Sequence, residues 1–162
     1  MQTILISTDF QNKAFNCIPS LCNQFEGKEL SLVFTHMFKL SDSESDLLML
    51  ARRAKEFEAI PEEFYRHCYN LKSSYPQIKH VKIEFFYGST LIAFKNFLEA
   101  NCIDSILDTA YHPVGKINKL SVNPELFVQR SGYPIISVYR AANTSTSFKT
   151  NQTVKEELTE TL

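Results

Sequence analysis

Five short apolar runs alternate along this chain with longer stretches of a different pattern. The runs have the length and the composition of buried strands. They are Ile4 to Ser7, Leu30 to Phe38, Val81 to Tyr87, Cys102 to Leu107 and Pro134 to Tyr139. The stretches between them repeat their apolar residues every three or four positions, as amphipathic helices do. This alternation predicts an α/β fold with an open, mainly parallel, doubly wound sheet and helices on both of its faces.

Proline interrupts the first two helical stretches. Pro19 lies inside the apolar pattern of residues 12–25, so we expect this helix to be kinked or to start late. The second pattern runs from Asp46 to about Ser74, and we expect Pro61 to break or kink it.

Two shorter helices are predicted in the second half of the chain. Ser89 and Thr90 can cap a helix over residues 91–101. Its expected inward residues are Ile92, Phe94, Phe97 and Leu98. The last helix would be capped by Ser121 or Asn123 and would end near Arg130.

Composition excludes several function classes. The chain has 162 residues, 44% of them hydrophobic, enough for one domain with a sizeable core. A net charge of -1 argues against a nucleic-acid partner, since such surfaces are basic. No apolar run approaches the roughly 18 residues of a membrane span, so we expect no membrane partner. The first ten residues read as a strand rather than a signal peptide.

Four cysteines stand singly in apolar surroundings and form no CxxC pair; they are Cys17, Cys22, Cys68 and Cys102. Such spacing predicts reduced, mostly buried thiols in a cytoplasmic protein, with no metal site. From residue 141 the chain turns rich in Thr, Ser and Asn. We therefore expect one domain over residues 1–140 and a polar tail over residues 141–162.

The segment from Leu107 to Val122 connects the fourth predicted strand to the last predicted helix. In open α/β proteins, a glycine-rich turn at such a junction brings backbone N–H groups onto a phosphate. Gly115 is the only glycine in this segment. The position therefore suits a phosphate loop, but the residue types do not.

Four segments in order resemble the universal stress protein family. They are Ile6 to Phe10, Phe34 to Met37, Gly88 with Asn101 to Asp104, and Val128 to Val138. The resemblance covers roughly residues 1 to 140. It implies a five-stranded, Rossmann-like sheet in the order 3-2-1-4-5, of the type of the adenine nucleotide alpha hydrolases. It also implies a homodimer that pairs its last strands, here Pro134 to Tyr139.

Nucleotide-binding members of that family carry a signature after the fourth strand. It is glycine, two residues, glycine, nine residues, glycine, then Ser or Thr. On this chain, without a gap, these positions fall on Asp108, Tyr111, Ser121 and Val122. The spacing is kept and the residue types are lost, so we expect no ATP cofactor. Asp108 would repel a polyphosphate, and Tyr111 would put a ring where bare backbone is needed.

A crevice at the strand ends can persist without ATP. Ser7, Thr8, Asp9 and Met37 lie at the predicted carboxyl ends of the first two strands, where ligands of α/β proteins bind. By the resemblance, Asp9 would lie near an adenosine. It could equally cap the first helix by accepting backbone N–H groups.

An enzymatic function is a weaker interpretation. Asp108, His112 and Asp9 could cluster at the crevice for acid–base chemistry or metal binding. No nucleophile elbow, HExxH or Walker motif is present. His36, at a strand end, is expected to be a hydrogen-bonded core residue.

These observations favour a non-enzymatic stress-response or regulatory module that acts as a homodimer on an unknown protein partner. The first alternative is a protein that binds ATP, AMP or another small molecule in the strand-end crevice. The second is a hydrolase that uses Asp108 and His112.

Overall fold

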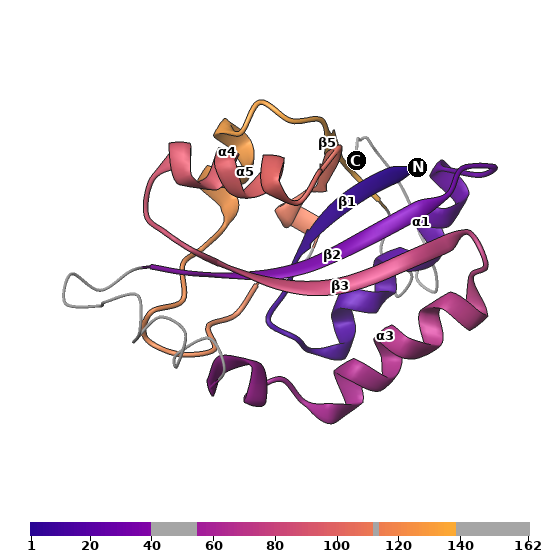
Figure 1. Cartoon of the computed structure of the whole chain (residues 1–162), viewed down its shortest axis with the longest axis horizontal. Coiled ribbons are helices and arrows are strands. Elements are labelled where there is room, and N and C mark those ends of the chain that lie inside the picture. The colour runs from indigo at the N-terminus through magenta and orange to yellow at the C-terminus, as the bar shows by residue number, and fades with distance from the viewer. Residues whose placement is uncertain (40–54, 112–113, 139–162) are drawn as a thin grey trace, which may run out of the picture.

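In the computed structural model of this chain, which describes residues 1–39, 55–111 and 114–138, parallel strands form one open sheet (Figure 1). The sheet has 5 strands in the order β3-β2-β1-β4-β5, and every neighbouring pair is parallel. The strands are β1 (Gln2–Ser7), β2 (Leu30–Phe38), β3 (Ile78–Tyr87), β4 (Ser105–Leu107) and β5 (Ile135–Ile136). The predicted fold class and strand order are confirmed.

Helices cover both faces of the sheet. The α-helices are α1 (Ile18–Gln24), α3 (Glu62–Ser74), α4 (Leu91–Ala100) and α5 (Glu125–Arg130). Two 3₁₀ helices, η1 (Asn12–Cys17) and η2 (Thr109–Tyr111), follow β1 and β4. Helices α1 and α3 lie on one face, here called the α1/α3 face, and helices α4 and α5 lie on the other, the α4/α5 face (Figure 1).

Proline sets where two helices begin. The first helical stretch starts as η1, and α1 begins only at Ile18 with Pro19 in its first turn, where a missing N–H costs no bond. Pro61 is the residue before the first turn of α3, so it separates α3 from the preceding residues. Residues 46–54 of the predicted second helix lie outside the described residues.

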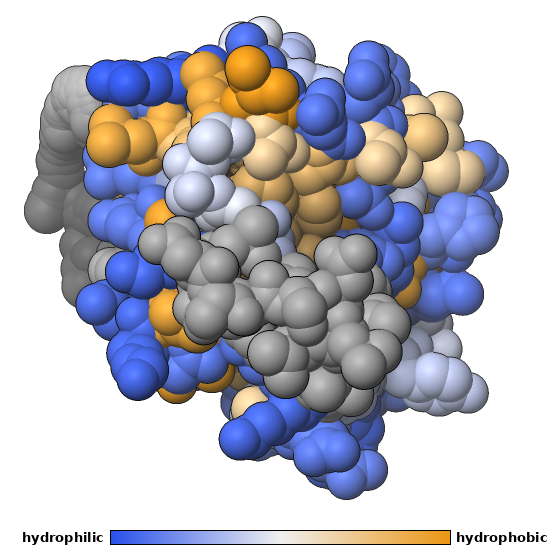
Figure 2. All heavy atoms as spheres, turned by 60° about the vertical axis from the view of Figure 1, so that its left-hand side comes forward, coloured by the Kyte–Doolittle hydropathy of each residue, from blue (hydrophilic) through white to orange (hydrophobic). Residues whose placement is uncertain are grey.

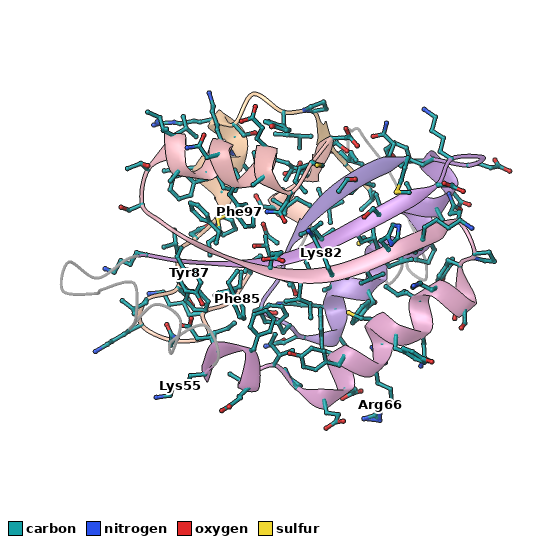
Figure 3. The ribbon with its side chains drawn as sticks, in the orientation of Figure 1. Lys55, Arg66, Lys82, Phe85, Tyr87 and Phe97 are labelled. Carbon is teal, nitrogen blue, oxygen red and sulfur yellow. The ribbon has the colours of Figure 1, made fainter. Side chains whose placement is uncertain are left out.

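Alternation along the strands builds two separate cores. Ile4 and Ile6 of β1 pack on the α1/α3 face in a cluster that includes Phe64. Leu5, between them, packs on the α4/α5 face with Phe94. Figure 3 shows the same division, with Phe85 on the side of α3 and Phe97 on the side of α4.

The end of α4 shortens the fourth strand. Cys102 adopts a left-handed φ of 56° and donates its N–H to the carbonyl of Glu99 at 3.0 Å. The N–H of Ile103 reaches the carbonyl of Leu98 at 3.0 Å. These two bonds form a Schellman motif that holds both residues in the helix end. The strand predicted from Cys102 therefore starts only at Ser105.

Other expected details differ in the structure. Ile92, expected to face inward, is 74% exposed, because it lies one position off the stripe of Phe94 and Leu98. The last strand is Ile135–Ile136 rather than Pro134 to Tyr139, and Tyr139 lies outside the described residues. The carbonyl of Ser137, just past β5, accepts a bond from the Gln24 side chain at 2.6 Å.

Candidate functional site

The carboxyl ends of β1 and β2 lie side by side, with Ser7 opposite Thr35. Past β1 the chain turns sharply, and Phe10 takes a left-handed φ of 65° that is unusual for a bulky residue. Two side chains build this turn. Thr8 Oγ1 accepts the N–H of Phe10 at 2.9 Å, and Asp9 Oδ1 accepts the N–H of Gln11 at 3.3 Å. The turn directs the Phe10 ring into the α1/α3 core.

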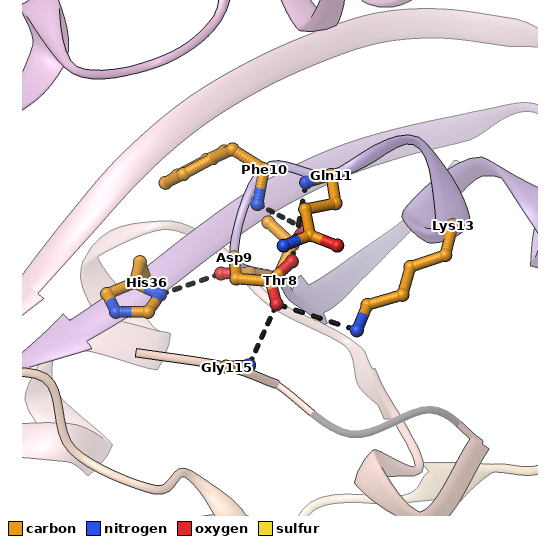
Figure 4. Close-up of polar contacts among 7 residues, drawn as sticks. All are labelled: Thr8, Asp9, Phe10, Gln11, Lys13, His36 and Gly115. Atoms are coloured by element: carbon orange, nitrogen blue, oxygen red, sulfur yellow. Dashed lines mark hydrogen bonds and ion pairs between the residues drawn. The ribbon is translucent and has the colours of Figure 1, made fainter. Parts of the chain in front are cut away.

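Asp9 is bonded to the loop that follows β4. Its Oδ2 accepts the N–H of Gly115 at 2.8 Å and lies 3.6 Å from Lys13 Nζ (Figure 4). The Asp9 side chain is only 4% exposed. A Cβ on Gly115 would lie 2.9 Å from Asp9 Oδ2, so any larger residue would have to displace the Asp9 carboxylate. The helix-capping role expected for Asp9 is not observed, because Gln11 occupies the N-cap position of η1.

His36 connects the same turn to the same loop. His36 is 1% exposed; Nδ1 lies 2.8 Å from the carbonyl oxygen of Thr8, and Nε2 lies 2.7 Å from Ser121 Oγ. Since a carbonyl only accepts, Nδ1 carries the proton, and neutral Nε2 accepts from the hydroxyl of Ser121. Burial lowers the pKa of His36 below its ordinary 6.5, which keeps the ring neutral. The expected hydrogen-bonded core histidine is confirmed.

Residues 114–122, here called the covering segment, cross the end of β2. Ser121 forms an antiparallel bridge with Phe38, the N–H of Val122 donates to Met37 at 2.8 Å, and the N–H of Lys39 donates to Leu120 at 2.9 Å. These bonds pair backbone groups at the end of β2 that extend past the end of β1 and would otherwise have no strand partner on that side. The covering segment therefore lies across the expected crevice at the end of β2.

The network extends to the residues before α3. Glu56 is 7% exposed, and its two carboxylate oxygens accept from Tyr87 at 2.6 Å and from the Asn118 amide at 3.2 Å. Asn118 belongs to the covering segment. Glu56 therefore anchors this segment at a second point, beside β3 rather than after β1.

The structure brings together only some of the predicted site residues. Thr8, Asp9, Met37, Ser121 and Val122 meet at the strand ends. Neither Ser121 nor Asn123 is the N-cap of α5, which is Pro124; the side chain of Asn123 accepts the N–H of Glu125 at 3.0 Å.

The remaining predicted site residues stand apart. Asp108 donates its N–H to Ile136 at 2.8 Å, and its Oδ1 accepts from Ala110 at 3.0 Å, which is a turn-forming role. Tyr111 ends η2, but its side chain and all of His112 lie outside the described residues. Ser7 is 5% exposed, and its hydroxyl has no hydrogen-bond partner among the described residues.

Sequence reasoning did not assign Gly115, Glu56 or Asn118 to the site. Gly115 carried a signal, because it is the only glycine in a segment expected to approach other backbone closely. His36 carried another, as the one titratable residue in the apolar run of β2.

A small cavity lies beside the covering segment. It has a volume of about 210 Å³ and is lined by Thr109, Ala110, Val114, Asn123, Pro124 and Glu125. Pockets for drug-sized ligands usually measure roughly 300–1,000 Å³. Among the described lining residues the one charged side chain is the Glu125 carboxylate, which would repel a nucleotide phosphate. Among the described residues, no group of three or more His, Cys, Asp or Glu could hold a metal ion.

Comparisons with known proteins point to one fold. No family model matches the sequence, and no curated protein matches it. Among solved structures, the universal stress protein UspA from Lactobacillus plantarum matches with a TM-score of 0.50 at 14% identity, over 85% of this chain and 97% of that one. An AMP-bound universal stress protein family protein from Arabidopsis thaliana matches at 10% identity and a TM-score of 0.47, over 91% and 97%.

A universal stress protein family protein from Burkholderia pseudomallei matches at 8% identity and a TM-score of 0.47, over 85% of this chain and 95% of that one. In the part of the chain that the structure describes, no helix is both long and apolar enough to cross a membrane. With its 3-2-1-4-5 parallel sheet and its match to UspA, the chain is a domain with the universal stress protein fold.

Proposed function

We propose that this domain is a stress-response or regulatory module that works through protein contacts and does not bind ATP in the strand-end crevice. One observation carries the proposal: the 2.8 Å bond between the Gly115 N–H and Asp9 Oδ2. Asp9 is the residue that the family resemblance would place near an adenosine. Here its carboxylate is closed off by the chain's own backbone, and its side chain is 4% exposed.

The loop chemistry supports the same proposal. Gly115, the only glycine of the loop, is already used for the approach to Asp9. The carboxylates of Asp108 and Glu125 lie on the two sides of the loop and would repel a polyphosphate. Val122 provides no hydroxyl at the last signature position. A nucleotide would have to displace the covering segment before it could bind.

We propose non-enzymatic action in the cytoplasm. The four cysteines are free, and three of them are buried, which suits a reducing compartment. The hydrolase alternative gains no support from Asp108, whose described bonds are those of a turn residue.

A homodimer through β5 fits the sheet order. β5 is the last strand of the sheet, and Ile135 on it is 41% exposed. Pairing of two such edges would bury Ile135 and complete the open ladder. The strand is short, so side-chain burial rather than ladder bonds would supply most of the affinity.

Nucleotide binding is the direct test. Purified protein is denatured and its supernatant analysed for released nucleotide; fresh protein is then titrated with ATP and Mg²⁺ by calorimetry. We expect no released nucleotide and no binding heat at ATP concentrations up to about 1 mM. A dissociation constant of about 1 mM corresponds to a binding free energy of about 4 kcal/mol, so any binding would be weaker than that. Tight ATP binding would overturn the proposal, and phosphate release during incubation would support the hydrolase instead.

Sedimentation tests the dimer separately. Ile135→Asp should shift the wild-type dimer to monomer, because it buries a charge in the proposed interface. Ile92→Asp on α4, where the native side chain is 74% exposed, serves as the matched control and should leave the dimer intact. A wild-type protein that sediments only as monomer at tens of micromolar would exclude pairing through β5.

A further inference from the structure

Ser121 Oγ makes three hydrogen bonds inside the molecule. It accepts the N–H of Ile117 at 2.9 Å and the N–H of Asn118 at 3.2 Å, and it lies 2.7 Å from Nε2 of His36. A hydroxyl has one donor hydrogen and two acceptor lone pairs. The two backbone N–H groups occupy both lone pairs, so the hydrogen points to Nε2. The hydroxyl is fully used only while Nε2 is free of a proton.

A proton on Nε2 would disrupt this arrangement. The other ring nitrogen already donates to the carbonyl of Thr8, so His36 cannot move its proton from one side to the other. Protonated Nε2 would become a third donor aimed at an oxygen with two lone pairs. One backbone N–H must then lose its acceptor, and the longer bond, from Asn118, is the weaker of the two. Asn118 is exposed, so its freed N–H would turn to water, and the covering segment would lose one of its bonds to Ser121.

We propose that His36 is an acid-sensitive latch: its neutral ring holds the covering segment over the strand ends through Ser121, and its protonation releases the segment and uncovers Asp9. The latch goes beyond the proposed function, because the module would expose a different surface in each of two pH-dependent states. In the neutral state, the strand ends are closed. In acid, the carboxylate of Asp9 and the ends of β1 and β2 become accessible to a partner or ligand.

The groups that face His36 act in opposite directions on its pKa. Burial is the largest influence and lowers the pKa; the Thr8 carbonyl, Asp9 and Glu56 raise it. Asp9 comes from the turn after β1 and is paired with Lys13 of η1. Glu56 comes from the residues before α3 and is bonded to Tyr87 of β3. Burial prevails, so the pKa of folded His36 lies below the ordinary 6.5.

The direction of the pH effect follows from the lowered pKa of folded His36. The unfolded chain binds a proton on this histidine more readily than the folded chain does. The stabilisation by the neutral ring is therefore complete above a pH of about 6.5, the unfolded value. It is lost as the pH falls from there through the folded pKa. The covering segment should respond first, because one of its several anchors is the bond that the proton removes.

Nuclear magnetic resonance on the wild-type protein tests the latch. Two-bond ¹H–¹⁵N spectra at pH 8 should show the proton of His36 on Nδ1. Exchange rates of the Ile117 and Asn118 amides, corrected for intrinsic pH dependence, should rise about threefold or more by pH 5. Core amides of Ile6 and Phe34 should keep their protection. A proton on Nε2 at pH 8, or equal loss in loop and core, would overturn the proposal.

Two variants separate the latch from general acid instability. In Ser121→Ala the covering segment should exchange rapidly at both pH values, because its acceptor is gone. His80→Gln is the matched control, since His80 is an exposed histidine of β3, and it should retain the wild-type response. If Ser121→Ala keeps the wild-type acid response, His36 does not act through Ser121 and the proposal fails.

Discussion

On the α1/α3 face the rings of Phe10, Phe15 and Phe34 pack around Phe64 with centroid distances of 4.9 to 5.3 Å. On the α4/α5 face the three rings around Phe94 lie farther away, at 5.5 to 6.5 Å. Two of these, Phe97 and Phe127, are only partly buried. The same strands therefore support one core with closer ring packing, although Phe15 is also only partly buried, and one core with wider ring spacing.

The surface of the α4/α5 face is also less well covered, because it exposes large apolar side chains. Ile92 of α4 and Leu126 of α5 are 74% and 61% exposed. Figure 2 shows apolar residues gathered at the top of the molecule, where α4 and α5 lie. The hydroxyls of Ser7 and Thr35, which point to this face, are buried without a partner among the described residues. Buried side-chain hydrogen bonds are found at the strand ends instead. There the rings of Phe10 and His36 connect the α1/α3 core to the covering segment.

The largest expected difference between the two faces is the rate at which their cysteines react with a thiol reagent. Burial raises the pKa values of Cys17 and Cys68 to about 12, and both thiols lie in the α1/α3 core. At pH 8 only about one in ten thousand of such groups is a thiolate. Cys102, at the end of α4, is exposed. A thiol reagent at pH 8 should modify Cys102 at least about a thousandfold faster than either buried thiol.

Mass spectrometry of labelled peptides measures that difference site by site. Cys102→Ser supplies the control, since it should abolish the fast phase and leave the slow one. Fast labelling of Cys17 or Cys68 in the folded protein would mean that the α1/α3 core opens readily, contrary to the comparison.

Matched aromatic deletions should separate the two cores next. Phe64 and Phe94 are both fully buried phenylalanines on opposite faces. Removal of either ring should cost about 3–5 kcal/mol of unfolding free energy. Phe64→Ala should lie near the upper end, because two of its three ring neighbours, Phe10 and Phe34, are buried. Two of the three ring neighbours of Phe94, Phe97 and Phe127, are only partly buried and can relax into the cavity left by Phe94→Ala. Urea denaturation of both variants measures which one loses more unfolding free energy. Equal losses, or a larger loss for Phe94→Ala, would show that the two cores do not differ in packing.

The fold was predictable because burial leaves a direct record in the sequence. The run from Leu30 to Phe38 is buried on both sides of the sheet, and its predicted bounds agree with the structure. The strand predicted from Pro134 to Tyr139 was too long, because a strand needs a partner and β4 has only 3 residues. Ile92 was placed inside because a single apolar residue on a helix surface has no distinguishing pattern.

The candidate site was predictable only in its location. The strand-end position of Asp9 and the isolation of Gly115 could be recognised separately. Their hydrogen bond could not, since the two residues are 106 positions apart in the sequence. Only the folded path of the covering segment brings them together. The same holds for His36 and Ser121, which are 85 positions apart.

Asp9 should show a smaller effect than either core ring. Asp9→Ala removes the bond from the Gly115 N–H to a charged carboxylate and should cost about 1–3 kcal/mol. Asp9→Asn retains an oxygen that can accept this bond, so it should lose less. The unfolding free energy of both variants at pH 8, measured in urea, gives the difference. If Asp9→Ala is no less stable than Asp9→Asn, the bond to Gly115 does not hold the covering segment.

The smallest expected effect lies on the α4/α5 face, at the end of α4. Cys102 is a non-glycine residue in the left-handed region, at the position where helix ends usually carry glycine. Glycine removes the Cβ strain there but increases the freedom of the unfolded chain, so Cys102→Gly should stabilise the protein by less than about 1 kcal/mol. Cys102→Ala retains the Cβ and is the control for loss of the thiol. A Cys102→Gly protein less stable than Cys102→Ala would show that the Leu98–Ile103 closure, rather than the backbone angle, dominates this helix end.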